Sequence, residues 1–151
     1  MHTTQISVIG SGSEWEKQAE EVGRLLAERG CTVVTGGGGE VMAAAARGAK
    51  QAGGRTIGIL PGESPSEANE WIDYAVATGS GHARNLAVAA SGDAVIAVGG
   101  GWGTMSEIAF ARRLGRPTVL LDPGLAVEGE GIMRAATPEE AVELALLALR
   151  S

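Results

Sequence analysis

The feature that most constrains this chain is the position of its glycines. Of 151 residues, 24 are glycine, more than twice the usual share of ~7%. They gather in short clusters, and each cluster follows a run of apolar residues, as at Gly36 to Gly39 and Gly99 to Gly103. No repeat connects the clusters, which excludes collagen-like and low-complexity sequence and leaves specialised turns at the ends of strands.

Apolar runs alternate along the chain with segments of helical periodicity. The predicted strands are residues 5–9, 31–35, 56–60, 71–77, 93–98, 117–121 and a short one at 131–136. The predicted helices lie between residues 13 and 30, at 40–52, at 82–90, from the glycine turn at 99–104 to about 114, and at 141–149. Residues 63–70 are polar and contain proline, which predicts a loop or a lid.

The strands are apolar without alternation, which indicates that helices cover both faces of the sheet. The runs at 94–98 and 118–121 show this most clearly, and it is typical of a parallel sheet. We therefore predict one α/β domain over residues 1–151: a Rossmann-like, doubly wound, mostly parallel sheet with helices on both faces. In this architecture ligands bind beyond the carboxyl ends of the strands, where all the glycine turns fall.

Helix starts are also marked by the spacing of a hydroxyl residue and a glutamate three positions later, which is the pattern of a capping box. The predicted capping pairs are Ser13 with Glu16, Thr104 with Glu107, and Thr137 with Glu140, the last with Pro138 in the first turn.

Composition excludes several classes of protein. The net charge of −6 without a Lys/Arg cluster argues against nucleic-acid binding. The sequence has no signal peptide and no run of ~18 apolar residues, so we expect a cytoplasmic protein that does not enter the membrane. Cys31 stands alone, which excludes an internal disulfide and a multi-cysteine zinc site, and two histidines give no support to a metal site.

The glycine turns are candidates for binding a phosphate. Helix N-termini present unpaired N–H groups, and glycine lets an anion approach them closely. Glycines in such turns also serve tight turning and close helix packing without any ligand, and this alternative stays open. The first turn departs from the dinucleotide pattern GxGxxG, because Trp15 takes the third glycine position, so a classical NAD site is not expected. The candidate phosphate-binding residues are Gly10, Ser11, Gly36, Gly37, Gly38, Gly100, Gly101, Gly103 and Thr104.

Two charged residues beside these turns are candidates for contact with the ligand. Arg84 follows Gly79 to His82 at the start of a helix, where a cation opposes the helix dipole, and a phosphate or carboxylate partner would explain it. His82 and Asn85 are both able to donate a hydrogen bond to the same ligand, but nothing marks His82 as a general base. If a phosphate takes the helix start near Thr104, the Glu107 carboxylate is suited to ribose hydroxyls or a developing cation.

Two motifs resemble those of a known superfamily over essentially the whole chain. Residues 99–107, Gly-Gly-Gly-Trp-Gly-Thr-Met-Ser-Glu, resemble the PGGxGTxxE motif of the LONELY GUY proteins, often labelled lysine decarboxylases. Residues 81–85, Gly-His-Ala-Arg-Asn, and 91–98 look closer to the molybdenum cofactor carrier-like branch. Gly99 replaces the motif proline, and Asn85 stands where the enzymes usually carry lysine.

The resemblance implies two possible functions. The first is a carrier-like protein that binds the molybdenum cofactor, or a related phosphorylated nucleotide or pterin, without turnover and with no required cofactor. The alternative is a phosphoribohydrolase that cleaves the N-glycosidic bond of nucleoside 5′-monophosphates such as cytokinin precursors, with Arg84 and Glu107 as catalytic residues. The resemblance also implies a homodimer or tetramer, for which the sequence itself gives only hints, such as the alanine-rich segment 42–52.

Overall fold

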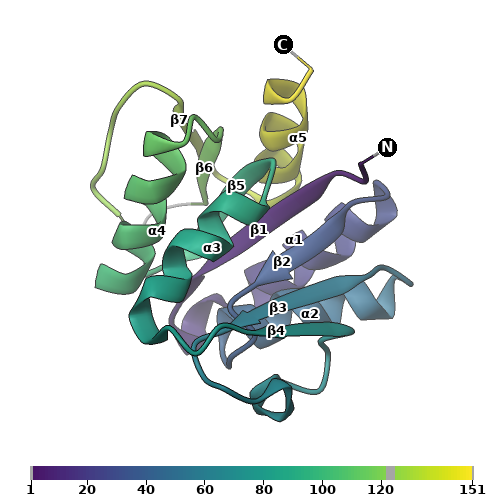
Figure 1. The fold of residues 1–151 in the computed structure, drawn as a ribbon. Coiled ribbons are helices and arrows are strands. Elements are labelled where there is room, and N and C mark those ends of the chain that lie inside the picture. The colour runs from purple at the N-terminus through teal and green to yellow at the C-terminus, as the bar shows by residue number, and fades with distance from the viewer. Residues whose placement is uncertain (1, 122–124, 151) are drawn as a thin grey trace.

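The fold is a parallel sheet between two layers of helices, seen in a computed structural model that describes residues 2–121 and 125–150 (Figure 1). The strands are β1 (Gln5–Ser11), β2 (Thr32–Thr35), β3 (Thr56–Leu60), β4 (Tyr74–Ala77), β5 (Ala94–Gly99), β6 (Thr118–Leu121) and β7 (Ile132–Ala135). The helices are α1 (Glu16–Glu28), α2 (Val41–Gln51), α3 (Arg84–Ser91), α4 (Trp102–Arg113) and α5 (Pro138–Ala148), with short 3₁₀ turns η1 (Ser13–Trp15), η2 (Pro65–Glu67) and η3 (Gly81–Ala83).

The order of strands in the seven-stranded sheet is β4-β3-β2-β1-β5-β6-β7, and every neighbouring pair is parallel. The chain builds the sheet outward from β1 to β4, then returns to place β5 on the other side of β1. This reversal makes the β1/β5 boundary the topological switch point, where ligands of open α/β sheets bind. The predicted Rossmann-like, doubly wound sheet is therefore confirmed.

Two apolar cores lie on opposite faces of the sheet. One contains side chains of α1, α2 and α5, with Ile6 and Ile96 from the strands. The other contains side chains of α3 and α4, with Ile9 and Val95. All residues of β5 are buried, which confirms that a non-alternating strand is covered on both faces.

The alanine-rich helix α2 packs inside this chain against α1. A Cβ added at Gly23 would lie 1.9 Å from the Ala45 carbonyl oxygen, and one added at Gly48 would lie 1.9 Å from the Glu20 carbonyl oxygen. The small residues of α2 are thus needed to bring two helices of the same chain close together. Packing within the chain therefore explains the small residues of segment 42–52, and the expected homodimer or tetramer stays a prediction.

The polar segment 63–70 contains η2 and folds against the turn after β2. Asn69 donates from its backbone N–H to the Gly37 carbonyl and from Nδ2 to the Gly38 carbonyl, at 2.9 and 2.8 Å. The expected lid thus covers a neighbouring turn. The fourth strand begins at Tyr74, later than predicted, because Trp71 is held in a turn by Asn69, whose side chain accepts its N–H at 2.9 Å.

Only one of the three predicted capping pairs has the geometry of a cap. Thr137 accepts a hydrogen bond from the Glu140 N–H at 3.1 Å, with Pro138 in the first turn of α5. The Ser13 and Glu16 pairing was wrong, because residues 13–15 form η1 and α1 begins only at Glu16, without a side-chain cap. The third pair belongs to the candidate site.

Within residues 2–121 and 125–150, no helix has the length and apolar character needed to cross a bilayer.

Cys31 is buried, and this burial raises the pKa of its thiol, as expected for a cysteine that acts as a small apolar residue.

Candidate functional site

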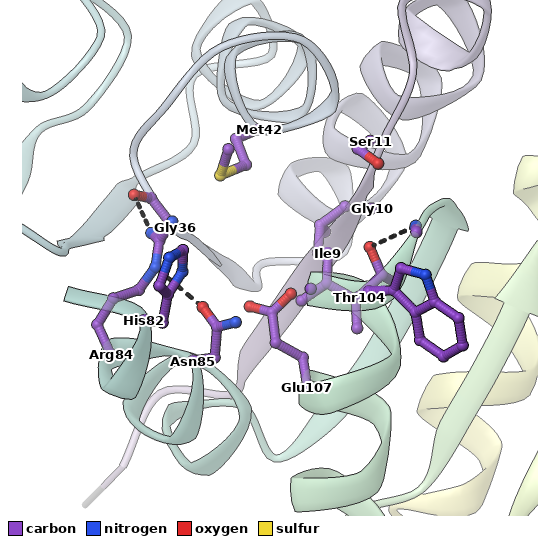
Figure 2. A pocket seen from close by; sticks show the side chains of 14 residues that line it. Ile9, Gly10, Ser11, Gly36, Met42, His82, Arg84, Asn85, Thr104 and Glu107 are labelled. Atoms are coloured by element: carbon purple, nitrogen blue, oxygen red, sulfur yellow. Dashed lines mark hydrogen bonds between the residues drawn. The ribbon is translucent and has the colours of Figure 1, made fainter.

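A cavity of about 270 Å³ opens at the β1/β5 switch point. Ligand pockets commonly have ~300–1,000 Å³, so this cavity fits one small ligand better than a dinucleotide. Its walls come from the end of β1, the turns that follow β2 and β5, the 3₁₀ turn η3 and the starts of α2, α3 and α4 (Figure 2). The lining residues are Val8, Ile9, Gly10, Ser11, Gly36, Met42, His82, Arg84, Asn85, Gly101, Trp102, Gly103, Thr104 and Glu107.

Residues 99–104, here named the open turn, run from the last residue of β5 into the first turn of α4 and expose backbone to this cavity. Gly100 has φ +139°, and a Cβ there would lie 2.7 Å from the Thr104 side chain, so this glycine serves the conformation of the turn. At Gly101 and Gly103, in contrast, the nearest atoms to an added Cβ are 4.0 Å away. These two glycines leave free space beside the backbone, where a ligand can approach.

The first turn of α4 has no side-chain cap. Its first backbone hydrogen bond runs from the Met105 N–H to the Gly101 carbonyl at 3.0 Å, so the N–H groups of the residues in between have no partner within the helix. Thr104 Oγ1 accepts a hydrogen bond from the Gly101 N–H at 3.4 Å. The predicted capping box of Thr104 with Glu107 was wrong, because the helix starts two residues before Thr104.

Gly10 and Ser11 form the end of β1 beside the open turn. Gly10 has φ +134°, and its Cβ would lie 1.9 Å from the Val98 carbonyl oxygen, so only glycine fits between β1 and β5 here. The Ser11 hydroxyl is the atom nearest to a Cβ added at Gly101. Both residues line the cavity, and their role in binding a phosphate stays a prediction.

The turn of residues 36–40 between β2 and α2, here named the closed turn, packs closely against protein atoms at Gly36, Gly37 and Gly38. Only Gly36 of its three candidate glycines lines the cavity. The carbonyls of Gly37 and Gly38 accept the hydrogen bonds from Asn69, and the Gly37 N–H donates to Thr35 Oγ1 at 3.0 Å. The alternative explanation of close packing therefore applies to Gly37 and Gly38.

Arg84 lines the cavity, but its hydrogen bonds go to backbone carbonyls. Nη1 donates to the carbonyls of Gly36 and Ile59 at 2.6 and 2.9 Å, and Nε donates to Asn85 Oδ1 at 3.0 Å. Desolvation lowers the pKa of Arg84, and Glu107 acts in the opposite direction. We expected an anionic partner to explain Arg84. The structure shows a second role, because the Arg84 side chain connects the closed turn to β3.

Asn85 lies between Arg84 and α4. Its Nδ2 donates to Ser106 Oγ at 3.0 Å, and Ser106 Oγ donates to the Gly103 carbonyl at 2.6 Å. Asn85 therefore links the start of α3 to the first turn of α4, and at the same time lines the cavity.

Glu107 projects into the cavity from α4, between Asn85 and Thr104 (Figure 2). Its carboxylate is partly buried and forms no hydrogen bond with the residues that the structure describes. Burial raises the pKa of Glu107 to about 7, although Arg84 opposes the shift. Functional sites commonly contain a carboxyl group in a cleft whose pKa is shifted towards neutral pH.

Five residues of the lining were not among the candidate site residues: Val8, Ile9, Met42, His82 and Trp102. His82 was considered from the sequence only as a possible hydrogen-bond donor. Met42 and Trp102 carry no pattern that distinguishes them from ordinary helix residues. Trp102 is 90% exposed.

Comparison with known proteins establishes the family. The sequence model of the SLOG cluster4 family matches residues 3–146, and the chain belongs to this family. An uncharacterized protein of Archaeoglobus fulgidus is 45% identical over 145 residues, covering 94% of each chain. A cytokinin riboside 5′-monophosphate phosphoribohydrolase of Mycobacterium tuberculosis is 34% identical over 114 residues, which cover 70% of this chain and 61% of that protein.

Solved structures extend the comparison over the full length. A molybdenum cofactor binding protein of Rippkaea orientalis superposes with a TM-score of 0.92 at 36% identity, covering 100% of this chain and 99% of that one. The molybdenum cofactor carrier protein of Chlamydomonas reinhardtii gives a TM-score of 0.88 at 32% identity, covering 99% of both chains. The chain thus belongs to the LONELY GUY-like superfamily. Within that superfamily it is similar to the branch that contains the molybdenum cofactor carrier proteins.

Proposed function

We propose that this chain binds a small ligand with a phosphate group and a nucleotide- or pterin-like ring, and that the phosphate lies at the open turn. The observation that carries the proposal is the uncapped start of α4, which faces the cavity with free space beside Gly101 and Gly103. Unpaired N–H groups and the helix dipole both favour an anion at this place. Ser11 adds a hydroxyl beside the same turn.

We propose that the role is that of a carrier, with the molybdenum cofactor or a related phosphorylated pterin or nucleotide as its cargo. The two molybdenum cofactor proteins resemble this chain over at least 99% of its length, whereas the mycobacterial phosphoribohydrolase matches 70% of it. Asn85, in place of the enzymes' lysine, is engaged with Arg84 and Ser106. A neutral amide at this position supports binding without turnover.

One observation favours the alternative of a phosphoribohydrolase. Glu107 presents an unbonded carboxylate to the cavity one helical turn after Thr104, and its pKa of about 7 leaves much of it ionised at neutral pH. An ionised carboxylate beside the sugar of a nucleoside 5′-monophosphate would stabilise an oxocarbenium-like transition state. Arg84 is then the second catalytic candidate, although its hydrogen bonds to carbonyls favour a positioning role.

Two measurements on the purified protein test the choice between these functions. Mass spectrometry of small molecules released from the native protein should identify a phosphorylated pterin or nucleotide if the chain is a carrier. Incubation with AMP and cytokinin riboside monophosphates should release no base. Base release that disappears in Glu107→Ala, but persists in the exposed control Glu63→Ala, would contradict the carrier and support the hydrolase.

We also propose that the chain forms a homodimer or tetramer. Tyr74 and Val76 on the edge strand β4 and Leu86 on α3 are 60%, 49% and 44% exposed, and large apolar side chains in such positions often lie in protein interfaces. Light scattering coupled to size-exclusion chromatography tests the proposal. A monomeric mass at micromolar concentration would contradict it.

A further inference from the structure

The cavity has a second end, which a phosphate at the open turn does not occupy. In Figure 2, Gly36, Met42, His82 and Arg84 lie on one side of the cavity, and Ser11 and Thr104 lie on the other. Asn85 and Glu107 lie between the two sides. A ligand that is held by its phosphate at the open turn would therefore place its remaining part between Met42 and His82.

The thioether of Met42 is held in place by the closed turn. A Cβ added at Gly36 would lie 2.7 Å from Met42 Sδ, and one added at Gly38 would lie 2.8 Å from Met42 Cε. These glycines therefore make room for the methionine, which lies in the first turn of α2 and is partly buried. A thioether is polarisable and makes favourable contacts with aromatic rings.

The imidazole of His82 approaches the same end of the cavity from η3. His82 is exposed, and its ring forms no hydrogen bond with residues 2–121 or 125–150. Because the residue is exposed, a ligand in the cavity can reach its ring, and imidazole can pack against another ring.

The chemistry of this end fits a ring better than a second anion. A thioether has no hydrogen-bond donor, and two of the three guanidinium nitrogens of Arg84, Nη1 and Nε, already donate to oxygen atoms of the protein. An apolar, polarisable surface opposite an imidazole is suited to a flat heteroaromatic group.

We propose that Met42 and His82 form the binding site for the heteroaromatic ring of the ligand and that they determine the preference for a ring-bearing phosphate over a simple sugar phosphate. This inference rests on the proposed function, which places the phosphate at the open turn. The ring packs against the Met42 thioether and the His82 imidazole, and the part of the ligand that joins ring and phosphate passes Glu107 and Asn85.

Titration calorimetry with AMP and with ribose 5-phosphate tests the proposal, because ribose 5-phosphate retains the sugar and the phosphate and carries a hydroxyl in place of the adenine ring. Chromatography after each titration checks that AMP is intact. The quantity of interest is the ratio of the two dissociation constants in the wild type, in Met42→Ala and in His82→Ala. Met42→Leu and His82→Phe are the matched controls, since they retain an apolar chain of similar size and an aromatic face.

We expect the wild type to bind AMP more tightly than ribose 5-phosphate, and we expect each alanine variant to lower this preference about threefold to tenfold. His82→Phe should restore the preference. Equal affinity of the wild type for both probes would overturn the ring site and leave the phosphate site intact. An equal loss for both probes in His82→Ala would also overturn it, whereas a wild type that binds neither probe would contradict the proposed function itself.

Discussion

The open turn after β5 and the closed turn after β2 have similar glycine-rich sequences and different surroundings. In the closed turn, a Cβ at Gly37 would lie 2.5 Å from Leu60 Cδ2, and Asn69 bonds the neighbouring carbonyls. In the open turn, Gly101 and Gly103 face free space at the cavity. The same residue type thus permits close packing in one turn and access of a ligand in the other, which is why glycine clusters alone do not locate a binding site.

The largest effect on stability should come from the closed turn. Gly37 has φ +75° and little space, so we expect Gly37→Ala to lower the free energy of unfolding by about 2–4 kcal/mol. Gly39→Ala, in the same turn with no atom within 4 Å of the added Cβ, is the control and should change it by less than about 0.5 kcal/mol. Urea denaturation measures both, and equal stability of the two variants would contradict the difference between the turns.

Arg84 should also matter mainly for the closed turn. Its removal leaves the carbonyls of Gly36 and Ile59 without their charged donor, so Arg84→Ala should lower the free energy of unfolding by about 1.5–3 kcal/mol. Urea denaturation of this variant at low and high salt measures the effect. A variant as stable as the wild type that loses salt-sensitive affinity for AMP would show instead that Arg84 acts on the ligand.

The open turn should show the opposite behaviour. Gly101 has an extended φ of −144°, so Gly101→Val should fold normally but lose about tenfold to hundredfold in affinity for AMP, because the side chain blocks hydrogen bonds to a charged group. Calorimetry measures the affinity. A folded Gly101→Val protein that binds AMP as tightly as the wild type would contradict the placement of the phosphate at this turn.

The smallest expected effect is a pH dependence that arises beside the open turn. Because the pKa of Glu107 is raised to about 7 from 4.5, the folded state binds more protons than the unfolded state between these values, and stability falls as the pH rises from about 4.5 to 7. We expect about 1–2 kcal/mol, since water still reaches part of the carboxylate. Urea denaturation at several pH values should show this slope in the wild type and a reduced slope in Glu107→Gln.

The order of strands and helices could be predicted because it depends on local periodicity. The β3 bounds, 56–60, agree with the prediction, and the cap at Thr137 was recognised because all of its atoms come from adjacent residues. The predictions failed where partners come from distant parts of the chain. Arg84 bonds Gly36, 48 residues away, and Asn69 bonds Gly38, 31 residues away.

The candidate site was predictable to the same extent. Gly101, Gly103 and Glu107 belong to one local motif, and the structure brings them to one cavity with Gly10, Ser11, Arg84 and Asn85, whereas Gly100 of the same motif does not line it. Met42 could not be found, because its position in the cavity depends on how α2 packs against the closed turn. The start of α4 was misplaced because Gly101, which has no side chain, ends the preceding turn without a recognisable cap.

Amide chemical shifts measured by NMR during titration with AMP test the central claim most directly. We predict that the N–H signals of Trp102, Gly103 and Thr104 shift in a saturable way as the ligand binds, while those of Gly37 and Gly38 change little. Saturable binding that leaves the amides of residues 102–104 unchanged would contradict the claim that the start of α4 holds the phosphate.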